Sequence, residues 1–282
     1  MQIITSIQKM QTESQKWQMA DKTCGFVATM GYLHQGHLSL LARAKEENDY
    51  SVVSIFVNPL QFAPTEDFAA YPRDQKRDRA LCEKHGADYL FIPEISDIYP
   101  EGFSSYVTVD GYNQHLCGMS RPDHFRGVTT IVNKLFNICR PDRAYFGQKD
   151  IQQLIILRKM TDDLNIPLEI CAVPTLRDPD GLAISSRNVY LSDTERKQAP
   201  GIYAALLSAQ QLIESGERDV ARIIENSKEV LASRVPVAQL EYLQIVDGKT
   251  LNPLSQVTDS VIIAVAVRMK KARLIDNIIL NI

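Results

Sequence analysis

The run from Thr29 to His37, Thr-Met-Gly-Tyr-Leu-His-Gln-Gly-His, constrains the fold more than any other segment of the chain. It follows a short apolar run at 25–28 and precedes an amphipathic segment at 38–45, an order that predicts a strand, a glycine-rich turn and a helix. His34 and His37 are therefore expected at a helix N-terminus, where backbone N–H groups lack helical partners and the helix dipole is positive. Such a turn predicts a site for the phosphates of a nucleotide.

Two glycines strengthen this interpretation of the histidine pair. Gly31 and Gly36 allow the backbone to approach a bulky anion, which a side chain would prevent. A metalloprotease pair would be spaced i, i+4 beside a glutamate, and that pattern is absent. Two surface histidines at a helix start are the ordinary alternative. The flanking glycines favour phosphate contact.

The first 175 residues or so alternate between strand-like and helix-like segments. This alternation predicts βαβ units, and hence a Rossmann-like parallel sheet with helices on both faces. Ligands of such sheets bind at the carboxyl ends of the strands. The expected strands are 25–29, 51–57, 87–92, 144–147 and 168–173, and the expected helices are 37–47, 74–85, 128–139 and 151–164.

The pattern changes after Pro174. Ser192 to Glu195 fits a capping box that starts one long helix ending near Gly216, and a second helix is expected at 218–233. Strand-like runs follow at 241–246, 261–268 and 274–279, which suggests a small antiparallel sheet. The prediction is an α/β protein with a Rossmann-like domain at 1–176 that binds a nucleotide. A smaller α+β C-terminal lid domain follows at 177–282.

Composition limits the classes of function. The chain is 45% hydrophobic and 23% charged, as globular proteins are, and its net charge of −3 gives no general attraction to nucleic acid or to an anionic membrane. Five scattered cysteines without a CxxC pair favour a reducing compartment. The N-terminus lacks signal-peptide features, and the longest apolar run, 261–267, is too short to cross a bilayer. We expect a cytoplasmic protein that binds neither nucleic acid nor membrane.

Two further segments contain groups suited to phosphate. In Gly147 to Asp150, lysine can bridge phosphates as a point charge, although Asp150 equally fits a helix cap. In Ile184 to Asn188, two hydroxyls lie beside a guanidinium at the expected domain boundary. Taken alone, this second segment is better interpreted as an ordinary loop than as a phosphate-binding segment. Its position suits a group that closes over a bound nucleotide.

Two more sets of polar residues remain ambiguous from their pattern alone. Gln61 and Gln153 are either solvated or face one pocket, in which case they suit a substrate with a hydroxyl and a carboxylate. The segment 120–127 contains two arginines and a histidine before a helix. A flexible lid and a plain surface loop both fit that segment, and the alternatives stay open.

Six segments occur in a characteristic order along the chain: Thr29–His37, Ser54–Phe62, His124–Val128, Phe146–Gln153, Asp180–Asn188 and Arg273–Asn277. In this order they resemble the pantothenate synthetase (pantoate–β-alanine ligase) family of the HxGH nucleotidyltransferase-like superfamily. The HxGH motif alone indicates only the superfamily. The full ordered set spans nearly the whole chain and is highly specific.

The resemblance implies an ATP-dependent condensation of (R)-pantoate with β-alanine, a step of pantothenate and coenzyme A biosynthesis. The pantoate carboxylate attacks the α-phosphate of ATP, giving pantoyl adenylate and pyrophosphate. The amine of β-alanine then displaces AMP. Such a reaction needs positioning and charge stabilisation more than a protein nucleophile. The resemblance also implies Mg²⁺ bound with ATP, no metal held by the protein alone, and a homodimer.

The resemblance also assigns roles to individual residues. Catalytic roles fall to His34, His37, Lys149, Ser185, Ser186 and Arg187. Pantoate is assigned to Gln61 and Gln153, and β-alanine to Gln61. ATP is assigned to Met30, Gly31, Tyr32, Leu33, His34, Gln35, Gly36, His37, Gly147, Gln148, Lys149, Asp150, Leu176, Ile184, Ser185, Ser186 and Arg187.

Four positions depart from the family pattern. Ala28 replaces a proline, Gln148 and Cys117 each replace a glutamate, and Asp123 replaces a glycine. The two lost carboxylates weaken any claim that an acid is essential there, and Asp123 bears on the mobility of the expected lid. None of the four removes a residue of the expected phosphate site, so an active enzyme is predicted.

Two other functions compete with this interpretation. A nucleotidyltransferase acting on a phosphorylated substrate would need no amine acceptor, and Gln61, Gln153 and the second domain argue against it. A nucleotide-binding regulator or an RNA-binding relative of the aminoacyl-tRNA synthetases is disfavoured by the negative net charge. The chain also lacks a basic stripe with interleaved aromatic residues.

Overall fold

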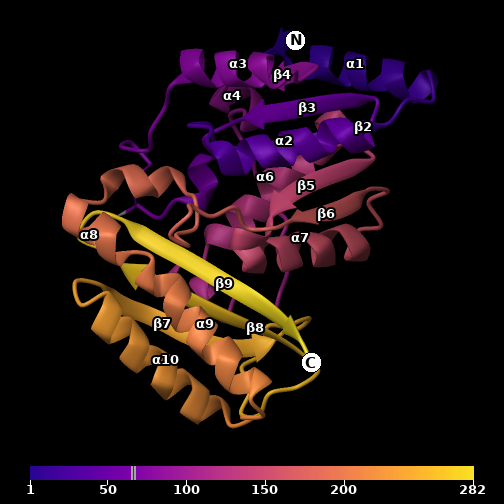
Figure 1. The fold of residues 1–282 in the computed structure, drawn as a ribbon. Helices are drawn as coiled ribbons and strands as arrows, with labels where there is room; N and C mark the ends of the chain where they lie inside the picture. Colours follow the sequence, from indigo (N-terminus) through magenta and orange to yellow (C-terminus); the bar gives the residue numbers. More distant parts are fainter. Residues whose placement is uncertain (65, 67) are drawn as a thin grey trace. The chain divides into compact units, whose positions relative to one another are not determined.

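The computed structural model describes residues 1–64, 66 and 68–282, and its internal contacts divide the chain into two compact units. The N-terminal unit comprises Met1–Gly111, Arg121–Gln148 and Gln153–Pro174. The C-terminal unit comprises Tyr112–Ser120, Lys149–Gln152 and Thr175–Ile282. Two short internal segments thus belong with the C-terminal part of the chain, although the residues around them belong to the N-terminal unit. Figure 1 shows the elements of both units.

The N-terminal unit is built on a six-stranded parallel sheet (Figure 1). Its strand order is β1-β4-β3-β2-β5-β6, so the chain runs outward from β2 through β3 and β4 on one side and through β5 and β6 on the other. The strand order therefore reverses between the paired strands β2 and β5, and ligands of such sheets gather at the carboxyl ends of the strands at this switch point. The strands are β1 (Gln2–Ile4), β2 (Cys24–Thr29), β3 (Tyr50–Ile55), β4 (Tyr89–Phe91), β5 (Arg143–Gly147) and β6 (Glu169–Val173).

Helices cover both faces of this sheet, as the sequence predicts. Side chains alternate along β2, so Phe26 and Val27 point to opposite faces. Val27 shares a buried cluster with Leu41 of helix α2 (Gln35–Glu47). On the other face, the ring of Phe26 meets that of Phe136 in α6 (His124–Cys139), with 6.2 Å between centroids.

The first strand and first helix were not predicted from the sequence. Helix α1 (Ile7–Met19) begins at Ser6, whose hydroxyl accepts a hydrogen bond from the N–H of Lys9. Its buried positions, Met10, Ser14 and Trp17, recur at helical spacing. This spacing is present in the sequence, but the many polar residues around it weaken the hydrophobic periodicity that predicts a helix.

The remaining elements up to residue 190 are mostly short. The helices are α3 (Gln75–Lys84), α4 (Ile95–Ile98), α5 (Cys117–Ser120) and α7 (Ile151–Asp163). The 3₁₀ segments are η1 (Pro59–Gln61), η2 (Gln148–Asp150) and η3 (Ser186–Tyr190).

The C-terminal unit contains an antiparallel sheet in the order β7-β8-β9, with β7 at Gln239–Asp247, β8 at Ser260–Arg268 and β9 at Arg273–Asn281. Alternate residues of β8, such as Val261 and Ile263, share a buried cluster with Leu206 of α9 (Gly201–Glu214) and Ile223 of α10 (Val220–Arg234). The predicted small α+β region with an antiparallel sheet is confirmed.

The single long helix predicted from Ser192 to Gly216 is wrong. The predicted capping box is present, since Ser192 and Glu195 bond reciprocally at the start of α8 (Asp193–Gln198). However, α8 ends at Gln198 and α9 covers Gly201–Glu214. Pro200 lies between them, and a proline in a helix lacks the N–H donor and crowds the preceding turn.

Two structural features concern the cysteines and the membrane. All five cysteines are buried and carry free thiols. Among residues 1–64, 66 and 68–282, no helix is long and apolar enough to cross a membrane.

Candidate active site

The turn after β2 is fixed by the side-chain hydroxyl of Thr29, which links it to the neighbouring strand β3. The hydroxyl of Thr29 donates to the carbonyl of Ser54 at 2.8 Å and accepts from the N–H of Gly31 at 3.1 Å. Gly31 has φ of 84°, a left-handed conformation that favours glycine. A Cβ there would also lie 3.0 Å from an oxygen of Asp78 and from Ile55. The glycine is thus required by both conformation and space.

Asp78 anchors this turn, a role not predicted from the sequence. Its carboxylate, only 1% exposed, accepts the N–H groups of Tyr32 at 2.7 Å and Leu33 at 2.8 Å. Burial raises the pKa of Asp78 above its usual value, while the two donors act in the opposite direction. The signal was an acidic residue in line with Cys82 on the buried side of α3. A buried charge on an apolar stripe needs a partner.

The two histidines cap the helix that follows. Nδ1 of His34 accepts from the N–H of Gly36 at 3.1 Å, and Nδ1 of His37 accepts from the N–H of His34 at 3.4 Å. The rings stack with 4.0 Å between centroids. A neutral imidazole whose Nδ1 accepts carries its proton on Nε2. The turn therefore holds two Nε2–H donors at a positive helix end.

Gly36 makes this capping arrangement fit. A Cβ on Gly36 would lie 2.9 Å from Cε1 of the His34 ring, closer than real contacts allow. The side chain of Leu33 is buried in the core of the N-terminal unit, and its N–H is bonded to Asp78. Tyr32 has φ of 50°, and the guanidinium of Arg77 lies 5.1 Å from its ring centroid.

Gln61 lies beside the turn that contains His34 and His37 (residues 29–37, the histidine turn). Its Nε2 donates to the sulfur of Met30 at 3.0 Å, and its Oε1 accepts from Nδ2 of Asn58 at 3.2 Å. Asn58 is itself buried and accepts a hydrogen bond from the hydroxyl of Tyr99 at 2.8 Å. The Gln61 amide is thus oriented by a second layer of polar groups. The structure brings two of the predicted residues, Met30 and Gln61, into contact.

The basic segment 120–127, which includes the first turn of α6, holds the loop that contains Gln61. Arg121 donates to the Gln61 carbonyl at 3.1 Å and forms a two-point ion pair with Glu66, and Nδ1 of His124 lies 2.9 Å from the same carbonyl. A Cβ on Gly127 would lie 2.3 Å from the carbonyl oxygen of Leu60, so only glycine permits this close approach. The segment therefore supports the Gln61 loop, a role that neither alternative from the sequence included.

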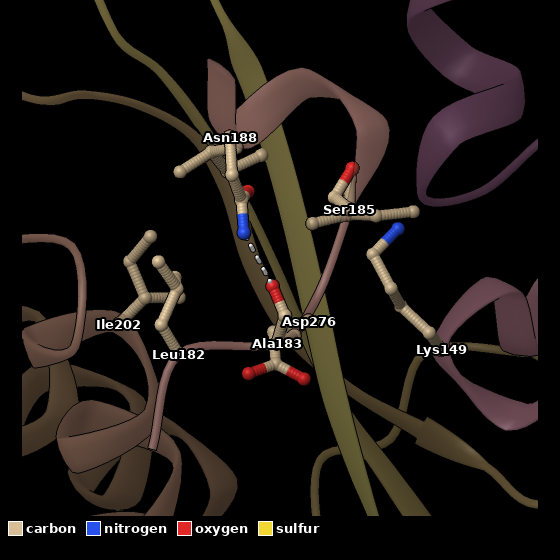
Figure 2. A pocket seen from close by; sticks show the side chains of 9 residues that line it. Lys149, Leu182, Ala183, Ser185, Asn188, Ile202 and Asp276 are labelled. Carbon is tan, nitrogen blue, oxygen red and sulfur yellow. Dashed lines mark hydrogen bonds between the residues drawn. The ribbon is translucent and has the colours of Figure 1, made fainter. Parts of the chain in front are cut away.

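A second group of predicted residues lies in the C-terminal unit, around a small pocket (Figure 2). Figure 2 shows the Lys149 ammonium pointing toward Ser185. Lys149 is mostly buried, with 19% of its side chain exposed, and its ammonium lies 3.8 Å from the carboxylate of Asp150. The pocket is lined by Lys149, Leu182, Ala183, Ser185, Asn188, Ile202, Leu274, Ile275 and Asp276.

The serine side of this pocket is held by a short hairpin and a cap. The N–H of Ile184 donates to the carbonyl of Leu176 at 3.0 Å, which pairs two residues predicted to bind ATP. Ser185 caps η3 by accepting the N–H of Arg187 at 3.2 Å. Asn188 donates to the carbonyl of Ala183 at 3.1 Å (Figure 2). The segment from Ile184 to Asn188 is therefore an ordered turn.

The predicted residues thus fall into two sets. Lys149, Asp150, Leu176 and 184–187 belong to the C-terminal unit. The N-terminal unit contains 30–37, Gln61, Gly147, Gln148 and Gln153. Gly147 ends β5 at the same sheet edge as the histidine turn, and a Cβ there would meet nothing within 4 Å. Gln153 is half-buried on the first turn of α7.

Comparison with known proteins gives a consistent result. A family model described as pantoate-beta-alanine ligase matches residues 2–279. Pantothenate synthetase from Thermosipho melanesiensis is 53% identical over 281 residues, and the one from Heliobacterium modesticaldum is 52% identical over 282 residues. In both cases the match covers 100% of each chain.

Solved structures agree with these relatives. The chain is similar to pantothenate synthetase from Thermus thermophilus, with a TM-score of 0.93, 46% identity and 99% of each chain covered. It is also similar to pantoate-beta-alanine ligase from Francisella tularensis, which was solved in complex with beta-gamma ATP and beta-alanine. That similarity has a TM-score of 0.80 and 33% identity, and it covers 99% of this chain and 97% of the other.

We predict that Asp78→Ala destabilises the protein because it leaves the N–H groups of Tyr32 and Leu33 buried without an acceptor. Each such donor costs about 1–3 kcal/mol. The matched control is Asp74→Ala on the same helix, which removes an exposed cap worth about 1 kcal/mol. Urea unfolding gives the free energy of both variants. Equal losses in the two would show that Asp78 does not anchor the turn.

Proposed function

The chain belongs to the pantoate–β-alanine ligase family. We propose that the two sets of residues described above act together in its two-step reaction. The chain condenses pantoate with β-alanine at the expense of ATP. A carboxylate oxygen of pantoate attacks the α-phosphorus of ATP, and pyrophosphate leaves. The β-alanine amine then attacks the acyl carbon of the pantoyl adenylate, AMP leaves with the bonding electron pair, and the amine loses a proton.

The single observation that most supports our assignment of the first step is the reciprocal cap of His34 and His37. Both Nδ1 atoms accept backbone N–H groups, so the ring proton of each lies on Nε2. We assign these two N–H groups to the phosphate oxygens of ATP, whose negative charge increases during displacement. The caps fix the rings before ATP binds, so little reorganisation is needed.

Lys149 and the Ser185–Arg187 turn supply the second set of phosphate contacts in this proposal. The Lys149 ammonium lines the same pocket as Ser185 and is mostly buried, so its charge is weakly screened. Ser186 and Arg187 add a hydroxyl and a guanidinium. We further assign 147–150 to ribose and phosphate, and Leu176 to the neighbourhood of the adenine.

Gln61 and Gln153 are our proposed pantoate residues, and Gln61 also lies near β-alanine in this proposal. The Gln61 side chain is oriented by Asn58 and contacts Met30 at the start of the histidine turn. An amide both donates and accepts, which suits a substrate carrying hydroxyls and a carboxylate. Orienting that carboxylate toward the α-phosphorus would favour attack without a protein nucleophile.

We also propose that Mg²⁺ enters with ATP, because Mg²⁺ usually combines one or two carboxylates with substrate phosphates. Asp150 fits such a role, since its carboxylate is half exposed and lies 3.8 Å from the Lys149 ammonium. When bound, the ion would neutralise phosphate charge. A homodimer, a cytoplasmic location and functional domains at 1–176 and 177–282 complete the proposal.

The reaction predicts two separable signals in one assay. With ATP, Mg²⁺ and pantoate alone, the protein is expected to exchange labelled pyrophosphate into ATP. Adding β-alanine should release AMP and pantothenate in equal amounts. A nucleotidyltransferase would ignore β-alanine, and a regulator would give neither signal. AMP release indifferent to both pantoate and β-alanine would refute the ligase assignment.

His37 and Lys149 are each expected to contribute about a hundredfold to turnover, as lost transition-state contacts typically do. His37→Asn keeps an acceptor near the Nδ1 position but lacks Nε2, whereas His37→Gln reaches the Nε2 position. We therefore predict that kcat falls more in His37→Asn than in His37→Gln. Lys149→Ala is compared with Lys159→Ala, an exposed lysine of α7 paired with Asp163. Near-normal kcat in His37→Asn and Lys149→Ala would mean that the phosphate site is misassigned.

The glutamines are expected to act on pantoate binding. Removing one amide contact in Gln153→Ala should raise the pantoate KM by about tenfold, equivalent to about 1.4 kcal/mol, with the ATP KM little changed. Gln8→Ala, an exposed glutamine of α1, is the control. Steady-state kinetics with each substrate varied in turn gives both constants. An unchanged pantoate KM in Gln153→Ala would rule out the assigned role.

A further inference from the structure

Strand β9 contains Arg273–Asn277, a segment that the family resemblance includes but to which it assigns no role. Asn277 is buried, and its Nδ2 donates to the main-chain carbonyl of Lys149 at 2.8 Å. The backbone N–H of Asn277 donates to Oδ1 of Asp276 at 2.8 Å. The amide of Asn277 is thus in direct contact with the residue whose ammonium lies in the pocket.

Asp276 is fixed in turn by an arginine. Its two oxygens accept from Arg177 at 2.5 and 2.8 Å, the bidentate geometry that orients a carboxylate most firmly. The Arg177 guanidinium lies 3.7 Å from the ring centroid of Tyr203. This part of β9 is therefore rigidly tied to the hairpin that precedes Ser185.

The other end of the segment is held through Cys117. Both terminal nitrogens of Arg273 lie 3.5–3.6 Å from the Cys117 sulfur, and the N–H of Cys117 donates to Oε1 of Gln152 at 3.0 Å. Nε2 of Gln152 donates to the carbonyls of Tyr112 and His115, both at 2.8 Å. These contacts explain why 112–120 and 149–152 belong to the C-terminal unit.

We propose that Asn277 is a positioning residue for Lys149, and that β9 sets the register of 149–152 within the C-terminal unit. This inference rests on the proposed function, in which Lys149 contacts the phosphates of ATP. The Asn277 amide holds the backbone from which the lysine extends, while Ser185 is placed by the same unit. The ammonium and the serine turn are thereby kept at a fixed separation.

The test is Asn277→Asp, which replaces the N–H donor with an oxygen facing the Lys149 carbonyl oxygen. The resulting shift of the lysine is expected to lower kcat by about tenfold or more, because small misplacements of a charge-stabilising group are costly. The pantoate and β-alanine KM values should change less than about twofold, since neither substrate is assigned to Lys149. The matched control is Asn281→Asp, the same change at an exposed position of β9, with kcat expected to be unchanged.

A double-mutant cycle separates positioning from general damage. If Asn277 acts through Lys149, Asn277→Asp should have little further effect on kcat in the Lys149→Ala background. Multiplicative losses would overturn the proposal, as would wild-type kcat in Asn277→Asp. Asn277→Ala, which removes the donor without adding charge, gives the same cycle if Asn277→Asp fails to fold. A near-normal kcat in Lys149→Ala would instead refute the assigned role of Lys149, and with it the proposed phosphate site.

Discussion

The buried carboxylate of Asp78 makes the contacts on which the histidine turn (residues 29–37) depends. A glycine-rich turn at the end of a parallel strand exposes consecutive N–H groups that no strand or helix partner satisfies. Asp78 accepts two of them, and Thr29 accepts a third. Only then can the backbone keep the left-handed conformation at Gly31 that directs the chain into α2. The histidines are placed by this turn, so their chemistry depends on a carboxylate that belongs to another helix.

The histidines, like Asp78, accept backbone N–H groups that have no helical partner. A helix start normally uses serine, threonine, aspartate or asparagine as its cap. Here the imidazole of His34 takes that place, and His37 completes the reciprocal cap. Capping therefore does two things at once, since it satisfies backbone donors and selects the ring tautomer with its proton on Nε2. Gly36 makes this arrangement sterically possible, because it has no Cβ to collide with the His34 ring.

The order of the elements and the position of the histidine turn could be predicted from the sequence, for physical reasons. The order of strands and helices follows from alternating hydrophobic periods, and the histidine turn follows from residues that are adjacent along the chain. Asp78 was missed, and Asn58 was given no supporting role, because the hydrogen-bond partners that define these roles are distant in the sequence. The break at Pro200 was overlooked, although proline chemistry predicts it. The Cys117 to Arg273 contact was invisible, because 156 residues separate the two positions.

Residues 149–152 belong to the C-terminal unit, so residues adjacent in the sequence need not act from the same part of the fold. Gln148 and Lys149 are neighbours in the chain, yet they belong to different compact units. A lysine that contacts phosphate gains from a defined separation from the other cationic and hydroxyl groups, because charge stabilisation falls with distance. Within the C-terminal unit, that separation is set by β9, through the Asn277 amide and the paired Arg177 and Asp276 side chains. The placement of a proposed catalytic residue thus depends on an asparagine that lies 128 residues later in the sequence.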